Sequence, residues 1–269
     1  METGPLRLGA WPVAGRVGAV VRTIDLSDGL SDEQVNDLHH LLAERGVVFF
    51  AAQKMGPDGH RDFARLLGDI RMPPDFFPSL RDDGYPDIGV IVSEGGGGRG
   101  AGTWHTDVPW APNPPRYSIL HFQEGPAGGG DTMWASQIAA YQRLSPPMRE
   151  FITPLTAEFK RISRIEDRSA IHPLVQRHPV SGELALYLSP SNTTRIIELE
   201  PNESDAVLAL LFTTVLRPES TCRWKWSPGD IGIWDNHFVL HHAIDDYGDE
   251  RRVIHRIEIE GEPLIPATA

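Results

Sequence analysis

The sequence of 269 residues contains a single cysteine, Cys222, and this scarcity limits what the chain can do. One thiol excludes an intrachain disulfide and any metal site built from several cysteines. A single cysteine is compatible with a reducing compartment. The first residues also lack a basic segment followed by a long apolar core, so no secretory signal is expected. We therefore expect a cytoplasmic protein.

Long apolar runs and an excess of positive charge are also missing. No stretch approaches the roughly 20 apolar residues needed to cross a bilayer, so no membrane partner is expected. The formal net charge is -12, whereas a nucleic-acid partner usually requires a basic face. These absences exclude nucleic-acid and membrane partners and leave a small molecule as the expected one.

Helical patterns occur mainly in the first half of the chain, and short strands between turns dominate the second half. Residues 31–46 favour a helix with Ser31 as N-cap and Gly46 at its end. No repeat or linker divides the sequence, so we expect one domain over residues 1–269. This order of elements favours an α+β or mainly β fold, a jelly-roll barrel with flanking helices.

A run of glycines, residues 95–98, resembles a phosphate-binding loop only superficially. It lacks the Lys-Ser/Thr pair and the helix that follow the glycines of a P-loop. We expect this run to form a loop over the active site instead.

The stretch "TWHTDVPWAPNPP", residues 103–115, places a histidine and an aspartate at alternate positions. Along a strand, residues i and i+2 point to the same side, so His105 and Asp107 can face one centre while Thr106 turns away. One imidazole and one carboxylate suit a divalent first-row metal ion. A third ligand is needed to complete an open site.

Three histidines in the segment "WDNHFVLHHAIDDY" are candidates for that third ligand, namely His237, His241 and His242. A triad of two histidines and one carboxylate occupies one face of an octahedron and leaves three positions open, for a bidentate cosubstrate and dioxygen. That geometry suits non-haem Fe(II) chemistry. The same ligands could hold zinc and an activated water, so a metal-dependent hydrolase is the alternative.

A keto-acid cosubstrate that chelates iron has a far carboxylate, and this carboxylate needs a cation. Arginine offers a planar, two-pronged match to a carboxylate. The segment "ERRVIHRIEIEG" supplies Arg251, Arg252 and Arg256. If this segment is a strand, Arg252 and Arg256 share one face and Arg251 lies on the other.

Six segments occur in the order and spacing of the motifs of a known family, from about Val17 to about Gly261. They are "WHTDVPW", "GGGDTMW", "HPLVQRHPVSGELALYL", "NTTRIIEL", "WSPGDIGIWDN" and "HHAIDDYGDERRVIHR". With these segments the chain resembles the taurine dioxygenase family, which consists of Fe(II)- and 2-oxoglutarate-dependent oxygenases. The resemblance implies a double-stranded β-helix, a cupin-like jelly roll with flanking helices, and the family's frequent assembly into dimers or tetramers.

The resemblance also assigns roles to individual residues by matched position. His105, Asp107 and His241 match the iron ligands, and therefore the catalytic centre. The far carboxylate of 2-oxoglutarate matches Arg252 together with the hydroxyl of Thr132. A further residue, Arg256, matches a second arginine near the cosubstrate and the substrate.

The implied reaction uses Fe(II), 2-oxoglutarate and dioxygen, releases succinate and carbon dioxide, and hydroxylates a small organic acid or natural-product intermediate. Asp107 favours hydroxylation over halogenation, because related halogenases carry a small residue at this position. Taurine itself is disfavoured, since Ala101 and the segment "GDIRMPPDFF" stand where taurine-oxidising members carry an asparagine and a histidine. A dioxygenase for sulfonates or alkyl sulfates is the alternative within the family.

Overall fold

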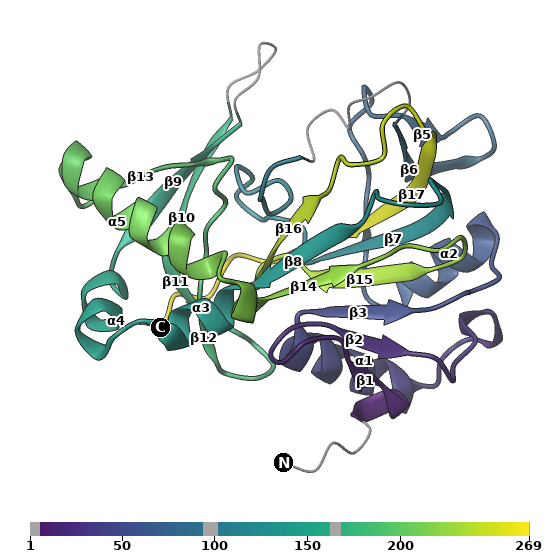
Figure 1. Ribbon diagram of the computed structural model, residues 1–269, viewed down its shortest axis with the longest axis horizontal. Helices are drawn as coiled ribbons and strands as arrows, with labels where there is room; N and C mark the ends of the chain where they lie inside the picture. Colours follow the sequence, from purple (N-terminus) through teal and green to yellow (C-terminus); the bar gives the residue numbers. More distant parts are fainter. Residues whose placement is uncertain (1–5, 94–101, 162–167, 269) are drawn as a thin grey trace.

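The structure is a computed structural model that describes residues 6–93, 102–161 and 168–268. The glycine run at 95–98 and Ala101 lie outside the described residues. The described part is largely β-structure with helices at its flanks, as the sequence predicts (Figure 1). None of the helices in the described ranges has the length and apolar character required to cross a membrane.

The largest sheet among the described residues has nine strands. Its order is β1-β2-β3-β15-β7-β17-β6-β5, and β4 pairs with β17. All neighbours are antiparallel except β2 and β3, which run parallel. The strands are β1 (Trp11–Pro12), β2 (Ala19–Val21), β3 (Val47–Phe50), β4 (Ile70–Arg71), β5 (Ser79–Leu80), β6 (Tyr85–Ser93), β7 (Tyr117–Glu124), β15 (Ile231–Asp235) and β17 (Arg252–Ile259).

A second sheet, in the order β14-β8-β16, packs against the inner face of the largest one. It consists of β14 (Thr221–Trp224), β8 (Thr132–Ser136) and β16 (Val239–Ala243). The rings of Phe49 and Trp134 meet edge to face with 5.1 Å between their centroids, and Trp134 lies 5.8 Å from Trp234. These buried aromatic contacts hold the two sheets together, because large rings bury much apolar surface.

Two helices near the start of the chain pack on the largest sheet, α1 (Asp32–Arg45) and α2 (Pro57–Arg65) (Figure 1). Ser31 caps α1 with its side chain and forms a capping box with Gln34. Gly46 ends the helix at φ 72°, where a side chain would be strained and its Cβ would lie 2.5 Å from Val239. The helix boundaries therefore agree with the capping pattern predicted from the sequence.

The remaining elements form a separate layer at the other end of the molecule, where the C-terminus also lies (Figure 1). A three-stranded sheet has the order β10-β9-β13, and β11 pairs with β12. These elements are β9 (Thr156–Lys160), β10 (Ser169–Pro173), β11 (Val175–Arg177), β12 (Leu184–Leu186), β13 (Thr193–Ile196), α3 (Gln137–Arg143), α4 (Pro146–Ile152) and α5 (Pro201–Val215). Three short 3-10 helices complete the described part, η1 (Arg7–Gly9), η2 (Leu26–Asp28) and η3 (Pro218–Ser220).

Candidate active site

Two histidines that are far apart in the sequence lie side by side because their backbones pair. The N–H of His105 donates to the carbonyl of His241 at 3.0 Å, and the reverse bond measures 2.8 Å. This antiparallel bridge continues the edge of β16 and brings the two ring centroids to 4.1 Å. The structure thus selects His241 among the three histidines that the spacing left open.

Asp107 completes a cluster with these histidines. Its Oδ1 lies 4.0 Å from Nε2 of His105 and 3.7 Å from Nε2 of His241. One potential ligand atom from each of the three residues lies within 4.8 Å of the others. No other group of three or more such residues with this spacing occurs in the described part of the chain.

Hydrogen bonds fix the backbone and the carboxylate of Asp107. Asn236 accepts from the Asp107 N–H at 2.8 Å and donates to its carbonyl at 2.9 Å. Thr106 turns away and donates to the same asparagine, which confirms the predicted alternation along "HTD". Ser118 of β7 donates to Oδ2 of Asp107 at 2.7 Å. Oδ1 therefore stays directed at the two imidazoles.

The donor set fits a divalent metal ion. Nδ1 of His105 lies 2.7 Å from the carbonyl of Thr103, and a carbonyl only accepts, so this nitrogen carries the proton. Nε2 of His105 is then the nitrogen directed toward Asp107. Burial holds the pKa of His241 well below its usual value, with a contribution from the neighbouring His105, so this ring is neutral at pH 7. Neutral imidazoles are the form that binds metal.

The charge of Asp107 is also maintained. Burial by itself raises the pKa of a carboxyl group, because it disfavours the ionised form. Arg256 and the two histidines outweigh this effect and hold the pKa of Asp107 well below its usual range. Arg256 contributes most, with Nη2 at 3.5 Å from Oδ1. Two imidazoles and one ionised carboxylate form the ligand set expected for a non-haem iron site.

Arg252 is a buried cation without a carboxylate partner among the described residues. Its side chain contacts the ring of Phe122, with 5.7 Å from guanidinium carbon to ring centroid, and Nη2 lies 3.5 Å from Oγ1 of Thr132. Its Nε has no hydrogen-bond partner within the described part. Burial lowers the pKa of this arginine. A buried guanidinium in this state is suited to receive the carboxylate of a ligand.

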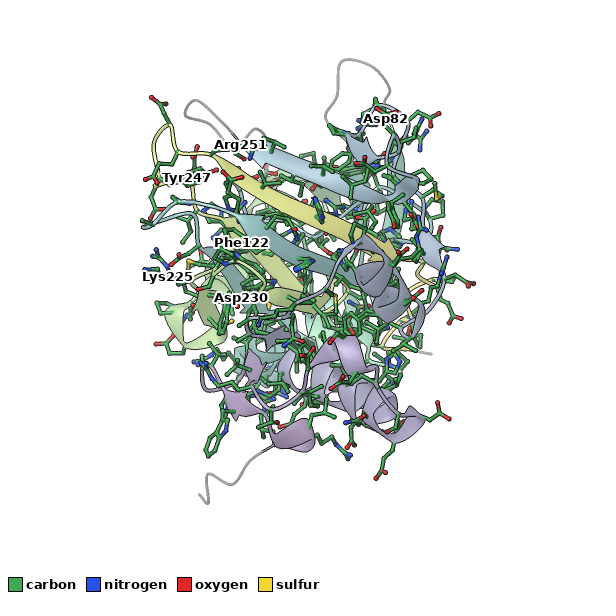
Figure 2. All side chains as sticks on the ribbon, turned by 90° about the vertical axis from the view of Figure 1, so that its right-hand side faces the viewer. Asp82, Phe122, Lys225, Asp230, Tyr247 and Arg251 are labelled. Carbon is green, nitrogen blue, oxygen red and sulfur yellow. The ribbon has the colours of Figure 1, made fainter. Side chains whose placement is uncertain are left out.

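The strand register places Thr132 and Arg252 on the inner faces of their sheets. In β8 and β16, Thr132 lies opposite Ala243, which is two residues from His241 and shares its face. In β17, the regular pairing with β6 keeps Arg252 and Arg256 on one face, as predicted. Phe122 lies at the same end of the largest sheet as Arg251 and Tyr247, and Asp82 lies at the other (Figure 2).

Arg256 lies between two carboxylates. Besides Asp107, its Nη2 contacts Oε1 of Glu258, which is two residues further along the same face of β17. Burial disfavours the charged guanidinium, but the two carboxylates hold the pKa of Arg256 above its usual value. Burial raises the pKa of Glu258, and Arg256 opposes this shift.

A cavity of about 570 Å³ opens beside this cluster and provides room for a substrate. Its wall is both basic and aromatic, and includes Phe76, Phe77 and Trp110. The guanidinium of Arg161 lies 5.1 Å from the ring centroid of Phe76 and 5.9 Å from that of Trp110. The basic residues of the wall are Arg71, Arg161, Arg168 and Arg256, and the acidic ones are Asp107 and Glu258.

The remaining candidate residues from the two histidine and arginine segments make their contacts outside the His-Asp-His cluster. His237 is buried, and its Nε2 lies 3.0 Å from the carbonyl of Pro114. His242 stacks on Trp104 with 5.4 Å between ring centroids. Arg251 is half exposed and pairs with Glu124, as expected for the outer face of the strand. None of these three side chains joins the His-Asp-His cluster.

Sequence reasoning missed three residues that shape the site. Ser118 and Asn236 orient Asp107 from strands that are distant in the sequence, and no local pattern indicates such contacts. Glu258 could have been found, because it follows Arg256 at the i+2 spacing used for the other assignments.

Two packed sheets with a His-Asp-His cluster and a buried unpaired arginine define a class of protein, the non-haem iron oxygenases that use a keto-acid cosubstrate. The comparisons with known proteins agree. The family model described as "Taurine catabolism dioxygenase TauD, TfdA family" matches residues 8–257. A crystal structure described as a putative alpha-ketoglutarate-dependent taurine dioxygenase from Burkholderia xenovorans superposes with a TM-score of 0.89 at 34% identity, covering 97% of this chain and 95% of that one.

Two curated relatives share a third or more of their aligned residues with this chain. The alpha-ketoglutarate-dependent sulfate ester dioxygenase of Pseudomonas putida is 36% identical over 97% of this chain and 93% of its own length. The alkylsulfatase of Acinetobacter baylyi is 33% identical over 93% of this chain and 84% of its own.

The chain belongs to the TauD/TfdA family of dioxygenases. It is an oxidoreductase that uses Fe(II), 2-oxoglutarate and dioxygen.

Proposed function

We propose that His105, Asp107 and His241 hold the Fe(II) ion and serve as the catalytic centre. The observation that carries this assignment is the convergence of their ligand atoms within 4.8 Å at the edge of a cavity. Each residue is also prepared for ligation, because the two imidazoles have free nitrogens directed inward and the carboxylate is ionised. A zinc-dependent hydrolase that used the same three ligands would have no role for the buried Arg252.

We further propose that Arg252 and Thr132 bind the far carboxylate of 2-oxoglutarate. The guanidinium has no internal counter-ion in the described part, and the Thr132 hydroxyl lies beside it. Trp226 donates to the same hydroxyl at 2.9 Å, which leaves its O–H free to point at a ligand. Arg256 lies closer to Asp107 and therefore faces the reacting end of the cosubstrate and the substrate.

The overall reaction that we propose is R–H + O2 + 2-oxoglutarate → R–OH + succinate + CO2. Bound iron supplies the activation of dioxygen for this oxidation. The protein holds the metal ligands in their correct protonation states and orients the cosubstrate. Phe76, Phe77 and Trp110 line the cavity and give it an apolar wall.

The substrate that we propose is a small organic anion with an apolar body, larger than taurine. Arginines supply the positive charge of the cavity, and aromatic side chains supply an extended apolar wall. The names of the relatives support this class, because one acts on sulfate esters and another is an alkylsulfatase. A sulfonate, an alkyl sulfate or another amphipathic acid all have this chemistry.

We infer that the two facing sheets form a double-stranded β-helix, a cupin-like jelly roll, and that residues 1–269 make one domain. The aromatic contacts between β8 and the largest sheet support the first inference. We retain the expectations of a cytoplasmic protein and of a dimer or tetramer. Sedimentation equilibrium would test the latter, and a monomer at all concentrations would contradict it.

Succinate formation tests the proposed reaction. Purified protein reconstituted anaerobically with Fe(II) should form succinate from 2-oxoglutarate when dioxygen and a substrate are added. The substrate panel would contain alkyl sulfates, alkanesulfonates and aryloxy acids of increasing length. Asp107→Ala should abolish the succinate formation that the substrate stimulates, because it removes a proposed metal ligand. Activity with zinc in the absence of 2-oxoglutarate, or full activity of the variant, would contradict the proposal.

A further inference from the structure

We propose that Glu258 determines substrate specificity by occupying Arg256 as an internal counter-ion, so that the anionic group of the substrate binds at Arg161 instead. This inference rests on the proposed function, because it assumes that the cavity receives an organic anion. It assigns an uncharged part of the substrate to the position beside Asp107. The anion and the reacting C–H bond would then be separated by an apolar spacer.

Arg256 is the basic side chain of the cavity wall that touches the proposed metal ligand Asp107, at 3.5 Å. An anion bound to a free guanidinium at this place would lie next to the metal. The oxidised carbon would then be adjacent to that anion.

Glu258 prevents this arrangement. Its carboxylate contacts Nη2 of Arg256, and its side chain is only 9% exposed. Both residues line the same cavity. A sulfate or sulfonate placed on Arg256 would meet this carboxylate and that of Asp107, and like charges repel strongly where water is excluded. The anion would have to displace a counter-ion that is part of the same strand.

The other arginines of the wall differ in their partners. Arg71 donates to Oε2 of Glu260 at 3.2 Å and to the carbonyl of Asn113 at 3.1 Å, so its charge is already neutralised. Arg161 has no carboxylate partner among the described residues. Its guanidinium lies over Phe76 and Trp110 instead. An arginine held between aromatic rings still presents its N–H groups to an anion, and the rings can contact an alkyl or aryl chain.

Together these contacts divide the charged side chains of the cavity wall into two groups. The His-Asp-His cluster lies beside the Arg256–Glu258 pair, in which the two opposite charges offset each other. Arg161 contacts Phe76 and Trp110 instead. A monoanion with an apolar chain of several carbons fits this arrangement, because different residues then hold its charge and its reacting C–H bond.

Binding of two alkyl sulfates to the wild type and to four variants tests the proposal. Wild type, Glu258→Gln, Arg161→Gln and the matched controls Glu219→Gln and Arg143→Gln would be loaded with Fe(II) and 2-oxoglutarate under anaerobic conditions. Both control residues are exposed and lie outside the cavity wall. Ethyl sulfate and hexyl sulfate would be titrated into each protein by isothermal titration calorimetry.

Glu258→Gln should bind ethyl sulfate about tenfold or more tighter than wild type, because it frees a charge-assisted hydrogen-bonding group. Arg161→Gln should weaken hexyl sulfate by about tenfold, because the sulfate loses its arginine partner. The controls should match wild type. Circular dichroism melting would verify that Glu258→Gln is folded. Arg161→Gln tests the proposed anion site at a position that is only partly buried.

Equal affinity of wild type and Glu258→Gln for ethyl sulfate, including no binding to either, would overturn the proposal. Unchanged binding of hexyl sulfate to Arg161→Gln, or no binding of it to wild type, would also overturn it. Failure of the proposed function has a different signature, namely no succinate formation with any amphipathic anion. Turnover that is insensitive to both substitutions would refute only the roles of Glu258 and Arg161.

Discussion

Arg252 carries a buried positive charge that the described part of the protein does not neutralise. Such a group is costly in the absence of a ligand, because burial removes its hydration. The lowered pKa of this arginine reflects the same cost. A protein retains such a residue where a bound anion compensates it, and the cavity-facing position beside Thr132 suits a carboxylate.

Arg252→Gln is therefore expected to weaken the binding of 2-oxoglutarate strongly. Truncating one partner of a buried charge pair typically costs about 2–5 kcal/mol. Anaerobic titration of the Fe(II)-loaded protein with 2-oxoglutarate would measure the dissociation constant. Arg251→Gln is the matched control, since it removes a half-exposed arginine from the adjacent position. An unchanged constant for Arg252→Gln would move the carboxylate site to Arg256.

For individual residues, the sequence predicts those positions whose geometry depends on local spacing. The i, i+2 pattern of His105 and Asp107 and the i, i+4 relation of Arg252 and Arg256 both hold in the structure. Local spacing alone does not single out His241. Its place beside His105 depends on backbone pairing between residues that are 136 positions apart in the sequence. Contacts such as Ser118 with Asp107 are set by the packing of strands and leave no local pattern.

At the scale of single elements, helix termini and strand register differ in how well the sequence predicts them. Helix α1 begins and ends where its caps predict, because capping depends on residues within one turn. The pairing of β7 with β17 contains an irregularity that shifts the register between Val253 and Ile254. A bulge of this kind depends on the partner strand, so the sequence of either strand alone does not indicate it.

Ser31→Ala is expected to destabilise the protein by about 1 kcal/mol, since it removes the side chain that accepts from the Gln34 N–H at the start of α1. Urea denaturation followed by circular dichroism would measure the loss. Ser31→Thr is the matched control, because threonine can make the same hydrogen bond. A loss of similar size in both variants would show that the cap is not the cause.

At the scale of the whole molecule, several histidines are buried in a neutral state. Burial lowers the pKa of His121 and of His237 to about 4, from an ordinary value of 6.5. Burial also holds the pKa of His60 well below that value, and neither of its ring nitrogens has a hydrogen-bond partner among the described residues. Unfolding therefore requires proton uptake at these residues in mildly acidic solution.

The free energy of unfolding should consequently fall as the pH decreases from about 6.5 towards 4. In this range the unfolded chain binds protons at these histidines and the folded protein does not, so acid favours unfolding. Each such histidine contributes a slope of up to about 1.4 kcal/mol per pH unit. Urea denaturation at several pH values would measure the slope, and His60→Leu should reduce it. A slope that is unaltered by His60→Leu would show that this ring is protonated in the folded state.

The proposed chemistry depends on three side chains, His105, Asp107 and His241. Anaerobic addition of Fe(II) and 2-oxoglutarate should produce the visible charge-transfer band of the iron–keto-acid chelate in wild-type protein. Asp107→Ala and His241→Ala should each abolish the band or greatly weaken it, while His242→Ala should retain it. A band of full intensity in both Asp107→Ala and His241→Ala would contradict the account.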